Sequence, residues 1–327
     1  MKIAYFDCFS GVSGDMCLGA LVSAGVDFDR LKAELAKMPV TGYDLRCEKG
    51  KRNSISCVNI FVDLLEEEQP ARGLADILQI IADSDLSDQV KNKSKEVFMR
   101  LAAAEAAIHD TTPERIHFHE VGAVDAIVDV VGTVWGLHQL QVDQIYASPL
   151  PVGRGFIKCM HGIIPAPAPA TLQILHNVPI YGTGVQSELV TPTGAALLAV
   201  LARDFINLPP LIVRNVGYGA GKNVMEHPNL LRLIVGESYA AKIGGHHHIC
   251  PHGHKKVHAH TDHTHTHEPG PGHDHCWRHK AGHSHDGQGH DHHQDQNHCH
   301  DHDHCHDHDH DHCHCHDLDR NHDHKSD

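Results

Sequence analysis

The chain of 327 residues is long enough for one or two domains, and its charge and histidine content divide it into two unlike parts. Seven of the 37 histidines precede residue 240 and the other 30 follow it, while the formal net charge of −15 divides into −7 before that residue and −8 after it. Neither part has the basic balance that attracts nucleic acid or an anionic membrane, so both are excluded as partners.

The first residues predict a strand and not a targeting segment. Met1 and Lys2 lead directly into an apolar run, without the longer apolar region of a secretory signal. No stretch approaches the ~18 consecutive apolar residues of a membrane-spanning helix. Five cysteines before residue 240 show no pairing pattern, and the other six lie among the later histidines, where thiolates would bind metal. We therefore expect a cytoplasmic protein.

Residues 1–240 carry the signals of a globular domain in which strands and helices are interleaved. A helix that Asp27 or Asp29 caps is expected to run to residue 38, and a turn at 49–54 is expected to join two strands. The predicted strands are 2–9, 43–48, 55–64, 144–148, 211–216 and 230–235, and the other predicted helices are 16–24, 74–82, 90–109, 124–138 and 194–205. This order predicts an α/β or α+β fold, a mixed sheet with packed helices.

Residues 151–169 are rich in proline. Each proline fixes its own backbone and restricts the residue before it, so the run Pro165–Pro169 is expected to be extended. The stretch is interpreted either as a rigid loop or as the wall or lid of an active site.

The segment from Asp7 to Asp15 is the first candidate site. A strand ends in a turn that contains glycine and serine, and a helix follows, so free backbone amides would suit a phosphate or carboxylate. The spacing is that of neither a Walker A loop nor a dinucleotide-binding turn. Both a structural turn and a ligand-contacting loop remain open; in the second reading Asp7, Ser10, Ser13 and Asp15 line the site.

A second candidate site begins at His117. In extended backbone His117 and His119 point to one face, which suits two imidazoles on one metal ion or on a phosphate. Glu120 follows them, and Asp125 and Asp129 share one face of the next helix, which is otherwise apolar. Such carboxylates are costly unless they cap, pair or serve a site, so helix capping is the alternative to a functional cluster.

A third set of residues has the chemistry of an anion site. Its members are Arg154, Lys158, His161, Thr191, Thr193 and the glycine-rich run 217–222, which ends in Lys222. Glycines beside a strand end let the backbone approach a ligand. The alternative for the glycine-rich run is a turn between two strands.

Residues 241–327 are interpreted as a disordered metal-binding tail. Repeated Asp-His, His-Asp and Cys-His pairs leave almost no apolar residues, so no core can form. Imidazole and thiolate suit nickel, zinc, copper and cobalt, and many equivalent sites suit buffering or delivery better than catalysis. The densest run of predicted ligands is His298, Cys299, His300, His302, His304, Cys305 and His306.

Several stretches in order resemble the LarC-type nickel insertion proteins. They are residues 5–16, 117–129, 149–155, 188–194 and 217–221, which cover residues 1–240 nearly end to end. The resemblance implies insertion of Ni(II) into a pyridinium-3,5-bisthiocarboxylic acid mononucleotide, with carbon–nickel and sulfur–nickel bonds, to give the nickel-pincer cofactor of lactate racemase. It also implies use of CTP with magnesium or manganese, bound by a C-terminal domain that we expect this chain to lack, as a first-frame product or a truncated gene.

The leading hypothesis is therefore a nickel insertion enzyme of the lyase type. His117, His119 and Glu120, with Asp125 or Asp129, would receive nickel or hold acidic groups of the substrate, and Arg154 and Lys222 would pair with its carboxylate or phosphate. The finished cofactor would pass to a nickel-pincer-dependent enzyme. The sequence allows a homo-oligomer without specifying one. The rival hypotheses are a non-catalytic nickel store or metallochaperone and, third, a metal-dependent hydrolase.

Overall fold

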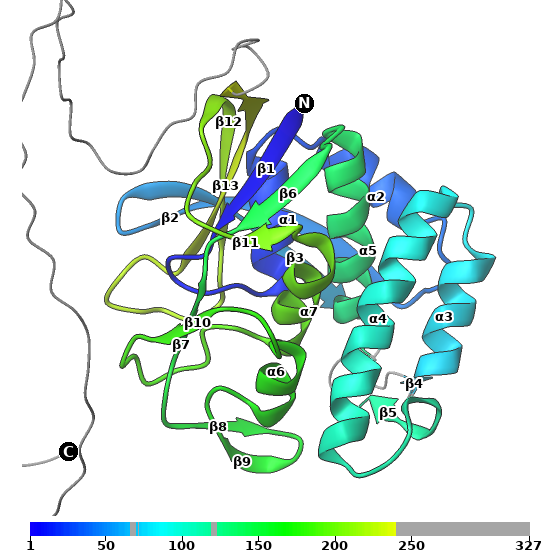
Figure 1. Cartoon of the computed structure of the whole chain (residues 1–327). Helices are drawn as coiled ribbons and strands as arrows, with labels where there is room; N and C mark the ends of the chain where they lie inside the picture. The colour runs from blue at the N-terminus through cyan, green and yellow to red at the C-terminus, as the bar shows by residue number, and fades with distance from the viewer. Residues whose placement is uncertain (66–69, 71, 119–122, 240–327) are drawn as a thin grey trace, which may run out of the picture. The chain divides into compact units, whose positions relative to one another are not determined.

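The computed structural model describes residues 1–65, 70, 72–118 and 123–239, which form a mixed sheet with helices packed against it (Figure 1). The main sheet contains β1 (Lys2–Asp7), β2 (Tyr43–Arg52), β3 (Ile55–Leu64), β6 (Gln144–Ala147), β11 (Asp204–Phe205), β12 (Leu211–Ala220) and β13 (Leu230–Ser238). Three smaller pairs are β4 (Arg72–Gly73) with β5 (His117–Phe118), β7 (Leu150–Val152) with β10 (Ile180–Gly182), and β8 (Phe156–Cys159) with β9 (Gly162–Pro165).

Seven α-helices and one 3-10 helix are described in the same residue ranges. They are α1 (Gly14–Ser23), α2 (Phe28–Leu35), α3 (Leu74–Asp83), α4 (Asp88–Ile108), α5 (Val124–Gln139), α6 (Pro169–Ile174), α7 (Pro192–Leu201) and the 3-10 helix Pro113–Arg115. None of these helices is long and apolar enough to cross a membrane.

The strand order of the main sheet is β11-β6-β1-β13-β12-β3-β2. β11, β6 and β1 run parallel to one another, β13 is antiparallel to both of its neighbours, β12 pairs in parallel with β3, and β3 forms an antiparallel hairpin with β2. The prediction of a mixed sheet with packed helices is therefore confirmed. The chain passes from the carboxyl end of β1 through a short connection to the start of α1, where the first candidate site was expected.

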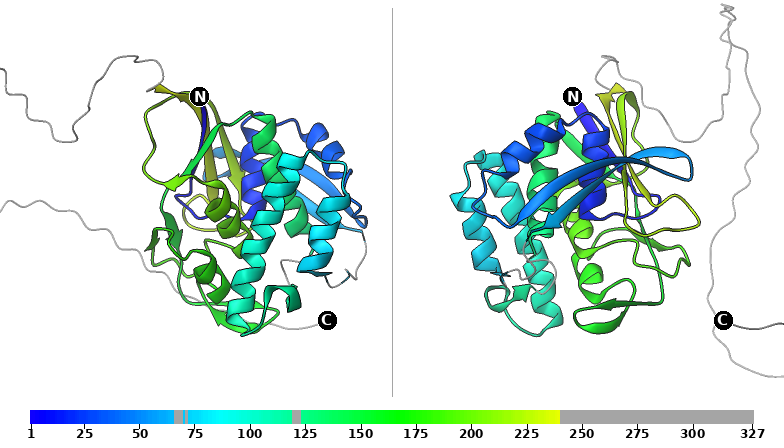
Figure 2. Two further views of the ribbon diagram at one scale, coloured as in Figure 1. Left: turned by 45° about the vertical axis from the view of Figure 1, so that its right-hand side comes forward. Right: turned by 180° about the vertical axis from the view of Figure 1, so that it is seen from behind.

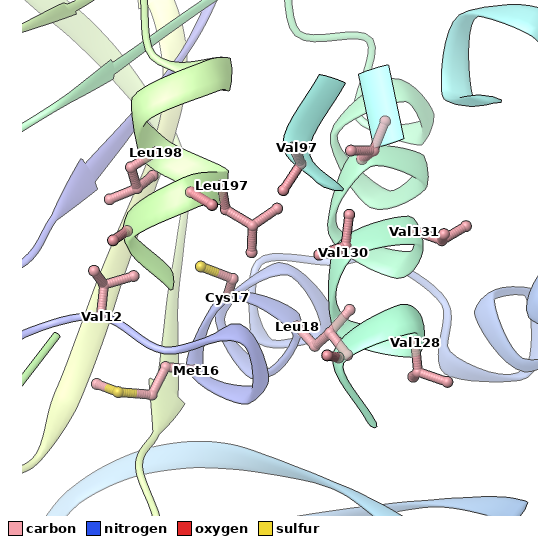
Figure 3. Packing of buried hydrophobic residues seen from close by; sticks show 14 of the residues in the cluster. Val12, Met16, Cys17, Leu18, Val97, Val128, Val130, Val131, Leu197 and Leu198 are labelled. Atoms are coloured by element: carbon pink, nitrogen blue, oxygen red, sulfur yellow. The ribbon is translucent and has the colours of Figure 1, made fainter. Parts of the chain in front are cut away.

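The helices gather on the side of the sheet that α1 covers (Figures 1 and 2). α1 packs against β12 and β3 and against α5 and α7, and α4 lies farther out, in contact with α5, α6 and α7. Figure 3 shows Cys17 and Leu18 of α1 between Leu197 of α7 and Val130 of α5, all of them buried. Burial of these side chains is the main force that holds the first turn of α1 against α5.

The glycine-rich run is mostly strand. The strand expected at 211–216 continues to Ala220, so Gly217 and Gly219 face α1 inside β12. A Cβ atom would lie 2.1 Å from the Ala20 carbonyl oxygen at Gly217 and 1.9 Å from the Met16 carbonyl oxygen at Gly219. The two glycines therefore allow close packing of helix on strand, and the interpretation of the whole run as a turn is wrong.

Other boundaries differ from the sequence predictions for local reasons. Asn53 and Ser54 adopt positive φ values of 45° and 67°, which makes the β2–β3 turn shorter than the expected 49–54. The helix expected to reach residue 205 ends at Leu201, and β11 follows it. Residues 151–169, interpreted as a rigid loop or as the wall or lid of an active site, contain most of β7, the β8–β9 hairpin and the first residue of α6. Asp27 is confirmed as a helix cap, since its side chain accepts a hydrogen bond of 2.8 Å from the Arg30 backbone N–H.

Candidate functional site

A polar cavity of about 290 Å³ opens where the start of α1 meets the start of α5. Two further segments close it: the residues before and within the first turn of α7, and the connection from β12 to β13. We call it the carboxylate cavity. Its polar lining residues are Ser13, Asp15, Asp125, Asp129, Glu188, Thr191, Thr193, Lys222, Asn223 and Asn229. Seven of these were predicted from sequence, so the structure brings residues from all three candidate sites together.

Backbone hydrogen bonds join the loop before α1 to the segment before α7. The Val12 N–H donates to the Leu189 carbonyl oxygen at 2.9 Å, and the Thr191 N–H donates to the Val12 carbonyl oxygen at 3.1 Å. Thr191 also caps α7, because its hydroxyl accepts a hydrogen bond of 3.2 Å from the Gly194 N–H. The threonines are thus held at the cavity wall by the backbone of the loop that carries Ser13.

Asp15 is oriented from two directions. The Ser13 hydroxyl donates a short hydrogen bond to Asp15 Oδ1, and the Met16 backbone N–H donates to the same oxygen at 2.9 Å. Asp15 lies in the first turn of α1, where the helix dipole favours a negative charge. The side chain of Asp15 is therefore held in one orientation at the cavity edge, while Ser13 is the N-cap residue without a side-chain capping bond.

Asp129 is the most perturbed ionisable group of the cavity. Loss of solvation raises the pKa of its carboxyl well above the ordinary range, Asp15 and then Asp125 raise it further, and Lys222 opposes them. The side chain fills space that only a glycine leaves open: a Cβ atom at Gly14 would lie 2.3 Å from Asp129 Oδ2. A carboxyl whose pKa is raised in this way is a stronger base than an ordinary aspartate, which suits a proton acceptor.

Asp125 occupies the first turn of α5, one turn before Asp129. Its Oδ1 accepts a hydrogen bond of 2.8 Å from the Ala126 N–H, so the capping alternative has some support at this position. Both residues nevertheless line the carboxylate cavity, in agreement with the shared helix face expected from their spacing.

The β12–β13 connection provides the opposite wall. The Gly221 N–H donates to the Asn229 carbonyl oxygen at 3.1 Å, and Asn229 Nδ2 donates to the Asn223 carbonyl oxygen at 2.9 Å. This arrangement holds Lys222 at the cavity, with its side chain exposed. Lys222 is the only cation among the residues that line the described cavity, so carboxylates outnumber it.

Sequence reasoning missed Glu188, Asn223 and Asn229. Glu188 opens the motif 188–194 that supports the family resemblance, so a signal for it existed. Asn229 is buried in a connection with no recognisable motif, and its role depends on hydrogen bonds within that connection, which the sequence does not reveal.

Several predicted residues lie outside the cavity lining, among them Asp7, Ser10 and Arg154. Asp7 forms an ion pair with Arg232, whose Nε donates to Asp7 Oδ2 at 2.9 Å. The Ser10 hydroxyl is buried and has no hydrogen-bond partner among the described residues. Arg154 is exposed, and its backbone N–H donates to the Val185 carbonyl oxygen at 2.8 Å.

The predicted metal ligands are mostly beyond the described residues. The backbone of His117 belongs to β5, and His119 and Glu120 lie in the gap at 119–122. The predicted tail ligands, His298, Cys299, His300, His302, His304, Cys305 and His306, lie outside the described residues as well. Within residues 1–65, 70, 72–118 and 123–239, no group of three or more His, Cys, Asp or Glu side chains is arranged to hold a metal ion.

Comparison with known proteins gives a consistent family. The family model described as nickel insertion protein matches residues 4–269. Two relatives from Desulfitobacterium hafniense, strains DCB-2 and Y51, are named pyridinium-3,5-bisthiocarboxylic acid mononucleotide nickel insertion protein; each is 53% identical over 237 residues, which make up 72% of this chain and 59% of the relative. A relative from Dictyoglomus thermophilum is 49% identical over 239 residues, 72% of this chain and 61% of its own length. No solved structure matches the chain.

Proposed function

Since the chain belongs to the nickel insertion protein family, we propose that it inserts Ni(II) into a pyridinium-3,5-bisthiocarboxylic acid mononucleotide. The chain spans about three fifths of the length of the curated relatives it matches, 59% to 61%, so the activity of those whole proteins is part of the proposal. The product would be the nickel-pincer cofactor, which a lactate racemase-type enzyme would receive. This chemistry would make the chain a cyclometallase of the lyase type.

The carboxylate cavity supports the proposal through the proton that the reaction must remove. A nickel ion held by both thiocarboxylate sulfurs, at ring positions 3 and 5, faces the ring carbon between them. Formation of the carbon–nickel bond there replaces a carbon–hydrogen bond and releases one proton, with no change in the total number of electrons. Asp129 lines the carboxylate cavity together with Asp15 and Asp125, and this placement is the observation that carries the proposal. In the proposal its carboxyl, whose pKa is raised by burial, accepts that proton.

The charges of the cavity also suit the substrate. A pyridinium ring is a cation, and the carboxylates of Asp15 and Asp125 favour a positive charge between them. Lys222 and the first amides of α1 have the chemistry to bind the phosphate of the mononucleotide. In this proposal Thr191 and Thr193 orient the substrate by hydrogen bonds.

CTP with magnesium or manganese has no comparable support in the described residues. Hard cations of this type need several oxygen ligands, and the described part of the chain holds no ready group of three. No step of the proposed reaction is therefore assigned to CTP.

The experiment is nickel transfer in vitro. The full chain, loaded with Ni(II), is mixed with the thiolated pyridinium mononucleotide, with and without CTP and magnesium or manganese, and the product is followed by mass spectrometry. We expect the precursor mass to rise by nickel minus the protons lost. Tightly held nickel with no nickel-bearing product under any of these conditions would contradict the proposal.

A nickel store or metallochaperone is the second candidate, and the 30 histidines after residue 240 favour it. Deletion of residues 246–327 separates the two functions. An insertion enzyme should keep its activity when nickel is plentiful, whereas a store should lose nearly all of its nickel capacity and have no activity to keep. Nickel bound per chain and product formed are measured on the same samples.

A further inference from the structure

A second cavity lies next to the carboxylate cavity, and the two share Glu188 and Pro192 in their linings. Its volume is also about 290 Å³, and its walls come from the end of α4, the β8–β9 hairpin and the start of α6. We call it the imidazole cavity, after His109 and His161. Its apolar lining residues are Ile108, Ile157, Ile164, Ala168, Pro169, Ala170 and Pro192.

Two histidines from distant parts of the chain meet in this cavity. His109 is the first residue after α4, and His161 belongs to the two-residue connection of the β8–β9 hairpin. Their ring centres are 5.1 Å apart and the ring planes are inclined by 34°.

This separation is compatible with one shared metal ion. With metal–nitrogen bonds of about 2.1 Å and an angle at the metal of about 90° to 110°, two imidazoles have ring centres roughly 4.5 to 5.2 Å apart. The observed 5.1 Å falls within that range. Only rotation of the rings is then needed to direct one nitrogen of each at a common point.

The surroundings of the two rings match a metal site that releases its ion. Glu105 Oε2 lies 3.6 Å from His109 Nε2, one helical turn back on α4, where a carboxylate can orient the ring or add an oxygen ligand. Half-buried Cys159 offers a thiol in the same cavity. Lys158 also lines the cavity, and its positive charge opposes tight retention of a cation.

We infer that His109 and His161 form a transfer site for a divalent metal ion with a preference for nitrogen and sulfur ligands, from which the ion passes to the carboxylate cavity. The inference rests on the proposed function for the identity of the ion as nickel. Two imidazoles meet in this cavity, and the positive charge of Lys158 in its lining favours release of the ion. The two cavities are adjacent, since Glu188 and Pro192 line both of them, so the ion would have only a short distance to travel.

The test is histidine footprinting of the full chain with diethyl pyrocarbonate, read peptide by peptide by mass spectrometry. The rates of modification are compared in a metal chelator and in nickel added beyond the capacity of the histidines that follow residue 240. At 90% occupancy we expect His109 and His161 to react about tenfold more slowly with nickel. Exposed His138 and His176 in the same domain are internal references and should change little.

Variants decide whether the two rings act together. His161→Gln should remove the nickel protection of His109, whereas His176→Gln, the matched control, should leave it intact. Equal reaction rates of His109 with and without nickel, or full protection of His109 in the His161→Gln chain, would overturn the transfer site. The footprinting result does not depend on insertion activity. Protection of the two histidines without any nickel-bearing product would support the transfer site and contradict the proposed function. Nickel-bearing product without protection would support the proposed function and contradict the transfer site.

Discussion

The two neighbouring cavities differ in the donor atoms that they present. The carboxylate cavity is lined by hydroxyls, amides and acidic groups, and it contains Asp129, a carboxyl whose pKa is strongly raised. The imidazole cavity has an apolar wall with two imidazoles and a thiol. Oxygen-rich surroundings suit proton transfer and a cationic ring, whereas nitrogen and sulfur suit a transition metal. In the proposed reaction, the ion would therefore bind first in the imidazole cavity and the organic substrate would bind in the carboxylate cavity beside it.

The largest expected effect that tests this separation of the two cavities comes from Asp129→Asn. Removal of the proton acceptor should slow nickel insertion by at least about 100-fold, while the nickel protection of His109 and His161 stays unchanged. Product formation and footprinting are measured side by side, with the exposed Asp29→Asn on α2 as the matched control. Insertion by the Asp129→Asn chain at the original rate would remove Asp129 from the reaction.

Gly14→Ala should damage the carboxylate cavity through packing. The new methyl group would meet Asp129 Oδ2 at 2.3 Å, so side chain and helix must shift, and we expect a loss of about 2 kcal/mol in the free energy of unfolding. Denaturant titration measures this loss. Gly50→Ala on β2 is the control, because its nearest atom, Asn59 Nδ2, would be 3.8 Å away. Equal stability of the two variants would show that Asp129 has room to move.

The pH dependence of stability should differ between the original chain and Asp129→Asn. The folded state holds the Asp129 proton more tightly than the unfolded state, because burial raises the pKa of this carboxyl. Its contribution therefore lowers the free energy of unfolding as pH rises above about 4, by at most about 1.4 kcal/mol per pH unit, until the raised pKa is passed. Subtraction of the Asp129→Asn curve isolates this contribution. A difference that grows in favour of the original chain with pH would contradict the assigned direction.

Asp7→Asn should have the smallest effect on stability. The Asp7–Arg232 ion pair is partly exposed, with side-chain exposures of 18% and 41%, so its loss should cost at most about 1 kcal/mol. The variant also tests the predicted catalytic role of Asp7, which lies outside the cavity lining. Thermal unfolding measures how much folded protein the variant loses. If insertion activity falls much more than the amount of folded protein, Asp7 takes part in the reaction.

Much of the carboxylate cavity could be predicted because its residues lie in short, recognisable motifs. Asp15, Asp125 and Asp129 were identified from helix starts and from carboxylates on an apolar helix, and the structure places all three at one cavity. Glu188 opens a motif that was recognised, but its place in the cavity depends on chain segments that meet only after folding. Asn229 was missed because its role depends on hydrogen bonds within a connection that has no recognisable motif. The carboxylate cavity gathers residues from four connections, and no local pattern reports such a meeting.

The imidazole cavity illustrates the opposite case. His161 was noted in the sequence only as part of an anion site, and residues 151–169 were interpreted as a rigid loop or as the wall or lid of an active site. The proline-rich sequence did not predict the β8–β9 hairpin, whose turn brings His161 to the end of α4. A contact between a helix end and a hairpin tip far along the chain has no periodicity, so sequence patterns could not predict it.

The two glycines of β12 have a mechanical consequence for the carboxylate cavity. Because the α1 backbone lies directly on Gly217 and Gly219, the helix cannot slide along the strand without collision with the next side chain. Asp15 at the start of α1 and Lys222 beyond the end of β12 therefore belong to one rigid frame. The distance between these two residues is therefore set by the backbone before any ligand binds. This distance selects ligands by their length.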